Sequence, residues 1–219
     1  MAKGIFKTSF KDTLPVLTGY LVLGMGFGII MNTNGYGILW SVGMSVFIFA
    51  GSMQYAAVGL LTGGASLLTV AVTTLAVNAR HIFYGISMAE KYKNTGAKKP
   101  YLIFSLTDET YSLVCSGEKS NEYYLLVSVL DHIYWVCGTA LGAILGESLK
   151  FNTEGIDFAL TALFITVFVD QWYKTKKHFP ALAGVGVSVI CLLIFGKENF
   201  LVPAMLGIAV LLLPGVRRA

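Results

Sequence analysis

Long apolar stretches, separated by short polar or charged segments, make up most of this 219-residue chain. A helix of about 20 apolar residues is long enough to cross the hydrocarbon core of a bilayer, and it satisfies its own backbone hydrogen bonds. The pattern predicts spanning helices at residues 13–31, 66–90, 122–146, 156–173, 180–195 and 200–213. We therefore expect an all-α polytopic membrane protein with a single integral membrane domain over residues 1–219.

Two further apolar segments are interrupted by small or polar residues. The segment 38–65 breaks at Ala-Gly-Ser-Met-Gln-Tyr (50–55), and the segment 101–117 carries Thr-Asp-Glu-Thr (107–110) in its middle. Short apolar runs on either side of a polar break are typical of discontinuous or re-entrant helices. The prediction is about six spanning helices plus two interrupted or re-entrant segments, and the alternative is eight full spans.

Basic residues lie between the predicted spans and orient them. The basic segments are Lys3 to Lys11, the four lysines of 91–99, the three of 174–177, and Arg217 with Arg218. Cytoplasmic loops of membrane proteins carry an excess of Lys and Arg. Six spans place all of these segments and both termini in the cytoplasm, whereas eight spans would place the 91–99 loop outside. The net charge of +4 suggests no nucleic-acid partner.

The composition excludes an ordinary soluble domain and indicates no enzyme. Only 13% of the residues are charged, against about 25% in soluble domains, and the mean hydropathy is +0.70. The three cysteines and three histidines are not spaced as metal ligands, so no metal, cofactor or disulfide framework is expected. Motifs of hydrolases, zinc proteases and phosphate-binding loops are missing, which also argues against a nucleotide-driven pump.

A polar stripe occurs in the apolar segment 66–90. Thr74, Asn78, His81 and Gly85 recur at helical spacing, so they would share one face of a continuous helix. Arg80 would project about 100° away from that face. We expect Asn78 and His81 to line a cavity, and Arg80 to pair with an acidic group or to reach the cytoplasmic headgroups.

Ionisable side chains at membrane depth cost about 2.5–3.5 kcal/mol each, so they are candidates for function. They are Arg80, His81, Asp108, Glu109, Asp131 and His132. Asp108 and Glu109 are adjacent and would both face one site only from an unwound backbone. Asp131 shares a helical face with Gly138 and Gly142, so helix packing is the alternative interpretation for it.

Four sequence blocks resemble the AzlC family, the large subunits of branched-chain amino acid exporters. In the order of the family they are AGSMQYAA (50–57), NARHIFYG (78–85), LTDETY (106–111) and the segment 164–172 that ends in VDQW. The resemblance covers nearly the whole chain. Its motif positions fall on Gln54, Asn78, Arg80, His81, Asp108, Glu109, Asp170 and Gln171.

The resemblance implies a secondary-active exporter of branched-chain or related apolar amino acids in the bacterial inner membrane. It also implies a small hydrophobic AzlD-type membrane subunit as partner. Proton coupling is expected because His81, Asp108, Glu109 and Asp131 are titratable. A passive channel for a small solute and an assembly subunit of a transport complex are the alternatives.

A zwitterionic substrate needs one anion-accepting and one cation-accepting site. The break at 51–54 would accept the carboxylate at a helix start, Asp108 or Glu109 would accept the ammonium, and Met53, Tyr55 or Phe83 would contact the side chain. A glycine kink that serves packing alone is the alternative at this break. The expected substrate-binding residues are Gly51, Ser52, Met53, Gln54, Tyr55, Asn78, His81, Asp108 and Glu109, and the expected coupling or ion-pair residues are Arg80, Asp131 and Asp170.

Overall fold

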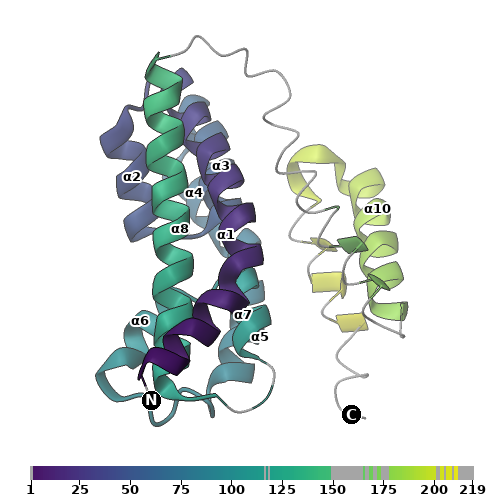
Figure 1. Cartoon of the computed structure of the whole chain (residues 1–219). Coiled ribbons are helices and arrows are strands. Elements are labelled where there is room, and N and C mark those ends of the chain that lie inside the picture. Colours follow the sequence, from purple (N-terminus) through teal and green to yellow (C-terminus); the bar gives the residue numbers. More distant parts are fainter. Residues whose placement is uncertain are drawn as a thin grey trace. The chain divides into compact units, whose positions relative to one another are not determined.

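The computed structural model describes residues 2–115, 117, 119–148, 165, 168–169, 172–173, 178–200, 203–204, 206–208 and 210–211. Within these ranges every regular element is a helix (Figure 1). The chain divides into a first unit, Met1–Leu160, and a second unit, Thr161–Ala219. The described helices of the first unit are α1 (Ala2–Thr33), α2 (Ile38–Phe47), α3 (Gly51–Thr62), α4 (Leu67–Asn78), α5 (Arg80–Met88), the 3-10 helix η1 (Gly96–Lys98), α6 (Lys99–Phe104), α7 (Asp108–Val114) and α8 (Asn121–Ser148); α10 (Phe179–Asn199) belongs to the second.

Helices α1 and α8 form the centre of the first unit and run parallel, side by side (Figure 1). A Cβ atom added to Gly138 would meet the backbone of Tyr20 and Leu21, and one added to Gly142 would lie 2.0 Å from the carbonyl oxygen of Met25. The later contact on α8, at Gly142, meets the later residue on α1, Met25, so the two helices run in the same direction. Glycine at these points lets the two backbones touch, as is common for helix pairs in membranes.

Helices α2 and α3 form a hairpin that enters from the carboxyl-terminal end of α1 and returns to it. Its tip, between the two helices, holds Phe49 at a φ of 42° and packs this ring edge-on against Tyr20. From the tip, α3 runs back toward the carboxyl-terminal end of α1. Its Tyr55 donates a hydrogen bond to the carbonyl of Leu23 and packs on Phe27, both of which follow Tyr20 on α1. The predicted interruption of residues 38–65 is confirmed.

Helices α6 and α7 form a second hairpin, which enters from the opposite end. Tyr101 near its start bonds to His132 of α8, and Thr107 at its tip lies 2.7 Å from the hydroxyl of Tyr20. At its return, the Lys91 ammonium donates to the carbonyl groups of Cys115 and Gly117. The second predicted interruption, in residues 101–117, is also confirmed.

Helices α4 and α5 connect the first hairpin to the second, and their path differs from the one predicted. They are bent by 48° at Ala79, so residues 66–90 are not one continuous helix. Thr74 and Asn78 therefore lie on α4 and His81 and Gly85 on α5, so the four do not share one face of a continuous helix. At the bend the helical pattern tightens, because the Ala79 N–H bonds to the carbonyl of Ala76 only three residues before it.

The tips of the two hairpins meet about halfway along α1. The Phe49 ring lies 6.3 Å from the Phe104 ring and 4.3 Å from the imidazole of His132. Tyr20, which contacts both tips, is within one turn of the centre of the candidate span Gly4–Thr33. The two breaks in the sequence therefore come together at the mid-depth of a membrane-length helix.

Three described helices are long and apolar enough to span a membrane, and the bent α4–α5 pair is a fourth candidate. They are candidate spans at the positions predicted, residues 13–31, 122–146 and 180–195, and the helices extend further at both ends than predicted. The span predicted at 66–90 corresponds to the bent pair. Most of the span predicted at 156–173 and part of the span predicted at 200–213 lie outside the described residues.

Candidate functional site

The starts of three helices meet at one arginine. Arg80 begins α5, and its Nη1 forms an ion pair with Asp108 Oδ2 at the start of α7, with 2.8 Å between the atoms. Its Nη2 donates a hydrogen bond to the hydroxyl of Ser52, the second residue of α3. The expected pairing of Arg80 with an acidic group is confirmed. We call the set Ser52, Arg80 and Asp108 the arginine junction.

Asp108 is held from both sides by α5. While Oδ2 pairs with Arg80, Oδ1 accepts a hydrogen bond from the hydroxyl of Tyr84, one helical turn after Arg80. Tyr84 stacks on Tyr111 of α7 at 4.4 Å between ring centres, and Tyr111 donates to Ser87. These contacts fix the carboxylate without closing the junction, because the side chains of Arg80 and Asp108 remain 31% and 30% exposed.

Two buried polar atoms, one on Arg80 and one on the residue two positions before it, find no hydrogen-bond partner among the described residues. They are the Nε of Arg80, a donor, and the Oδ1 of Asn78, an acceptor, on the two sides of the bend at Ala79. Buried polar atoms are nearly always satisfied, so an unpaired donor and acceptor together call for a ligand or water. The two atoms match what a carboxylate and an ammonium need, respectively.

A second polar cluster lies on the other side of α7. Tyr20 of α1 donates to Glu109 Oε2 at 2.7 Å and also contacts the hydroxyl of Thr107. Thr107 caps α7, and Thr110 donates to Oδ2 of the fully buried Asp131 on α8 at 2.8 Å. Asp131 Oδ1 has no hydrogen-bond partner among the described residues. Glu109 and Asp131 therefore face one network of hydroxyl groups.

The remaining residues of the first break are internal. Gln54 is fully buried, its Nε2 donates to Ser45, and its Oε1 accepts from the indole N–H of Trp135 at 2.9 Å. Met53 and Tyr55 are buried as well. Gly51 lies against Trp135, where a Cβ atom would be 2.9 Å from the ring. Ser52, by contrast, accepts a hydrogen bond from Arg80 and so belongs to the arginine junction.

His81 lines a cavity, as predicted, but Asn78 is not among the residues that line it. The His81 Nδ1 lies 3.1 Å from the backbone oxygen of Asn78, and the imidazole faces a separate cavity of about 200 Å³. The cavity is lined by His81, Gly85, Met88, Ala89, Tyr92, Lys99, Ile103 and Leu106. Burial, and to a lesser extent Tyr124, raises the pKa of the Tyr92 phenol, which stays a neutral hydroxyl there.

Tyr20 and Tyr84 are site residues that the sequence interpretation did not single out. Both are aromatic residues within apolar runs, so a pattern of apolar and polar positions does not distinguish their hydroxyl groups. The signal was available for Tyr20, because a tyrosine near the middle of a spanning helix is far from the interfacial belts that tyrosines prefer. Asp170 and Gln171 lie outside the described residues.

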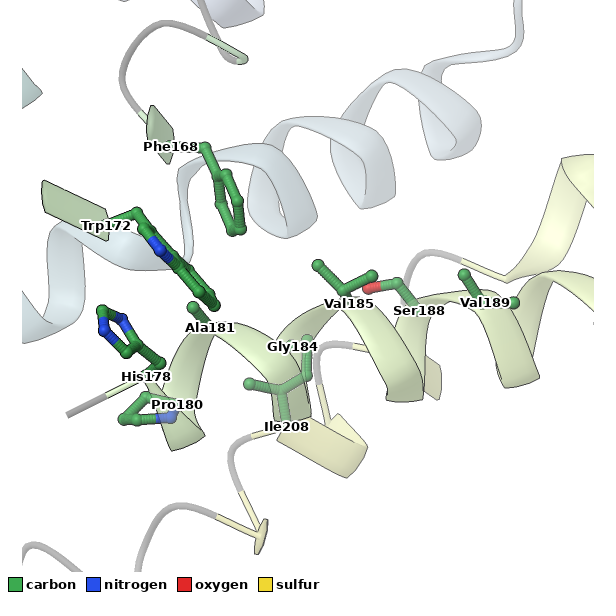
Figure 2. Close-up of a pocket in the computed structure, with 10 residues that line it drawn as sticks. All are labelled: Phe168, Trp172, His178, Pro180, Ala181, Gly184, Val185, Ser188, Val189 and Ile208. Carbon is green, nitrogen blue, oxygen red and sulfur yellow. The ribbon is translucent and has the colours of Figure 1, made fainter. Parts of the chain in front are cut away.

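The second unit contains a larger cavity of about 630 Å³ with a different chemistry. Figure 2 shows that Phe168, Trp172, Ala181 and Val185 contribute apolar side chains to it. Its one imidazole, His178, stacks on Trp172 at 4.0 Å. None of the described residues that line this cavity is an Asp, Glu, Lys or Arg, so none of them offers a counter-ion to either end of a zwitterion. The arginine junction is the better candidate site.

Comparison with known proteins matches most of the first unit to one protein family. The family model described as AzlC protein matches residues 15–149, which include both hairpins, the α4–α5 bend and α8. No solved structure matches the chain.

Curated relatives cover most of the chain. The branched-chain amino acid transport protein AzlC of Bacillus subtilis is 46% identical over 208 residues, covering 93% of this chain and 82% of the relative. An uncharacterized membrane protein of Haemophilus influenzae is 42% identical over 212 residues, with 94% and 87% covered. The inner membrane protein YgaZ of Escherichia coli is 28% identical over 193 residues, with 83% and 79% covered.

Proposed function

This chain belongs to the AzlC protein family, and we propose that it is the membrane subunit that exports branched-chain or related apolar amino acids. The name of the Bacillus relative supports the substrate class, and the name of the Escherichia relative supports an inner-membrane location. The observation that carries the proposal is the arginine junction, where a cation, an anion and the start of a 12-residue helix meet at mid-membrane depth.

An α-amino acid fits the junction by inserting into its ion pair. The substrate carboxylate replaces Asp108 on the guanidinium of Arg80, and the substrate ammonium takes the place of Arg80 beside Asp108. A guanidinium binds a carboxylate through two parallel N–H bonds, and the unpaired Nε of Arg80 supplies a further donor. The helix start at Gly51 and Ser52 adds the positive end of the α3 dipole on the carboxylate side.

The ammonium has more than one acceptor within the proposed site. Asp108 provides the charge, and the unpaired Oδ1 of Asn78 provides a neutral acceptor next to the bend. Among the residues proposed to contact the apolar side chain, Met53 and Tyr55 are buried in the hairpin, whereas Phe83 is 62% exposed. Phe83 is thus the one able to change its contacts when substrate enters.

The membrane arrangement that we propose has six spans and two re-entrant hairpins. The path of α2–α3 and of α6–α7, each returning to the end at which it enters, supports this arrangement over eight full spans. The 91–99 loop then lies at the same end as the start of α1, and its lysines join those of the amino terminus in the cytoplasm. Both termini are cytoplasmic in this proposal.

A small AzlD-type membrane subunit is proposed as the partner, and the proton gradient as the driving force. The family resemblance supports the partner. Large apolar side chains on α4 and α5, such as Leu75 (74% exposed) and Ile86 (71%), provide a surface for lipid or for a helical partner. The buried carboxyl group of Asp131, in the second polar cluster, supports proton coupling, because protons are carried through membranes by such groups.

Efflux from preloaded cells tests the proposed function. Cells that lack their own exporters and express this chain with an AzlD-type subunit are loaded with leucine, isoleucine or valine through dipeptides. We expect saturable efflux that slows when a protonophore collapses the gradient. The Glu90→Gln variant, which changes an exposed loop carboxylate, should match the unmodified chain.

Two results would contradict the proposal. Efflux equal to that of an empty vector, with both chains detected in the membrane, would remove the exporter assignment. Efflux that neither saturates nor responds to the protonophore would favour a passive channel instead. Expression of the chain without the small subunit separates the transport role of the chain from that of the pair.

A further inference from the structure

Glu109 and Asp131 are joined by an unbroken series of hydroxyl groups. From Asp131 Oδ2 the contacts run to Thr110 Oγ1 at 2.8 Å and to Thr107 Oγ1 at 3.0 Å. They continue to the Tyr20 hydroxyl at 2.7 Å and to Glu109 Oε2 at 2.7 Å. Each separation is that of a hydrogen bond between oxygens. Three helices contribute, α1, α7 and α8, so the packing of the first unit sets the series.

The hydroxyl groups of this series carry fewer protons than its hydrogen-bonded contacts require. Four oxygen–oxygen contacts require four protons, one for each contact. Thr110, Thr107 and Tyr20 carry one hydroxyl proton each, and ionised carboxylates carry none. With both carboxylates ionised, one pair of buried oxygens would face each other at 3.0 Å or less without a proton. One additional proton satisfies every contact.

We propose that Glu109 and Asp131 form one proton-binding site that holds a single shared proton. In one state Glu109 is protonated and donates to Tyr20, Tyr20 donates to Thr107, Thr107 to Thr110, and Thr110 to ionised Asp131. In the other state Asp131 is protonated and every hydrogen bond points the opposite way. Moving each proton along its own contact converts one state into the other, so a proton crosses from α7 to α8 and no charge is left on the hydroxyl groups.

The surroundings of the two carboxyls favour one proton rather than none. Asp131 is fully buried, no cation bonds to it, and its Oδ1 is unpaired within the described part of the chain, so its ionised form is poorly compensated. Glu109 directly follows Asp108, which pairs with Arg80. The other titratable groups that act on the pair are Asp108 beside Glu109, Tyr101 and Tyr123 near Asp131, and His132, which bonds to Tyr101 and the Ser45 carbonyl.

The role of this site in transport rests on the proposed function, whereas the shared proton itself does not. In a proton-driven exporter, the shared proton would be the coupling proton, held one residue from the Asp108 of the arginine junction. Glu109 is the end of the series that substrate binding reaches, and Asp131 is the end enclosed by α8. The proton count itself does not depend on transport.

Infrared spectroscopy of the purified full-length chain tests the shared proton directly. A protonated carboxyl group has a C=O band separate from those of carboxylates and amides. We expect the unmodified chain near neutral pH to show the band, and Glu109→Gln and Asp131→Asn each to abolish it. The amide that replaces either carboxyl donates the fourth proton, so the remaining carboxyl is ionised. Glu90→Gln, on the exposed loop, should leave the band unchanged.

Thr110→Val separates the two carboxyls while leaving both in place. Thr107 and Tyr20 then satisfy ionised Glu109, and buried Asp131 keeps a proton of its own. In this background Asp131→Asn should still remove the band, but Glu109→Gln should no longer do so. Circular dichroism and gel filtration identify variants that are folded.

Several outcomes would overturn the proposal. A chain without the band holds no shared proton. A band that survives in one of the two single variants belongs to one residue and is not shared. A band removed by Glu109→Gln even in the Thr110→Val background does not depend on the series described here. Because none of these measurements involves transport, their failure is distinct from failure of the efflux experiment.

Discussion

Replacing Arg80 with glutamine should reduce amino-acid export strongly, by about 30-fold. The substitution removes the cation that pairs with Asp108 and bonds to Ser52, and it leaves a carboxylate without its partner inside the bundle. Removing one partner of a hydrogen-bonded charge pair costs about 2–5 kcal/mol when the pair is buried. The Arg80 and Asp108 side chains are 31% and 30% exposed, so we expect the lower end, about 2 kcal/mol, which is a loss of about 30-fold in binding or rate. Efflux of leucine, normalised to the amount of protein in the membrane, measures the effect.

A lysine at position 80 should restore only a small part of the activity. Lysine keeps the charge but lacks the planar fork that contacts Ser52 and Asp108 together. Lys93→Gln is the matched control, because this lysine forms an exposed pair with Glu90 on the loop. Export by the Arg80→Gln variant at the rate of the unmodified chain would show that the arginine junction does not bind substrate.

Adding one methyl group to Gly142 should destabilise the protein strongly. In Gly142→Ala the Cβ would lie 2.0 Å from the Met25 carbonyl oxygen, so α1 and α8 must move apart. Overpacking of this kind costs about 1–3 kcal/mol, and a loss of about 3 kcal/mol lowers the melting temperature of a chain this size by about 6–12 °C. Thermal unfolding of the purified protein in detergent gives the value.

Gly19→Ala is the control for this effect, because nothing lies within 4 Å of a Cβ at that position of α1. Alanine is a better helix former than glycine, so this variant should be as stable as the unmodified chain or up to about 1 kcal/mol more stable. If Gly142→Ala melted together with Gly19→Ala, the close parallel packing of α1 and α8 would be wrong.

The sequence indicated the two hairpins because their breaks are local. Glycine, serine and glutamine interrupt one apolar run, and Thr-Asp-Glu-Thr interrupts the other, so short-range pattern is sufficient. The bend at Ala79 has no such signal, since neither glycine nor proline lies near it. It coincides with contacts of Arg80 to α3 and α7, which are distant in sequence.

The site was predicted in outline but not in its division of roles. Ser52 and Gln54 are both polar residues of one break, and only the packed structure separates them. The amide of Gln54 is hydrogen-bonded to Ser45 and Trp135, whereas the hydroxyl of Ser52 is hydrogen-bonded to Arg80. The link between Glu109 and Asp131 needed the tyrosine hydroxyl of α1, which hydropathy counts as part of an apolar run.

Equilibrium binding of leucine and two truncated analogues to the purified chain tests the central claim most directly. The account predicts that 3-methylbutylamine, which lacks the carboxylate, and 4-methylpentanoate, which lacks the ammonium, bind about 30-fold or more weakly than leucine. It also predicts that Arg80→Gln removes the advantage of leucine over the amine. If the amine bound the unmodified chain as tightly as leucine, the arginine junction would not be the amino-acid site.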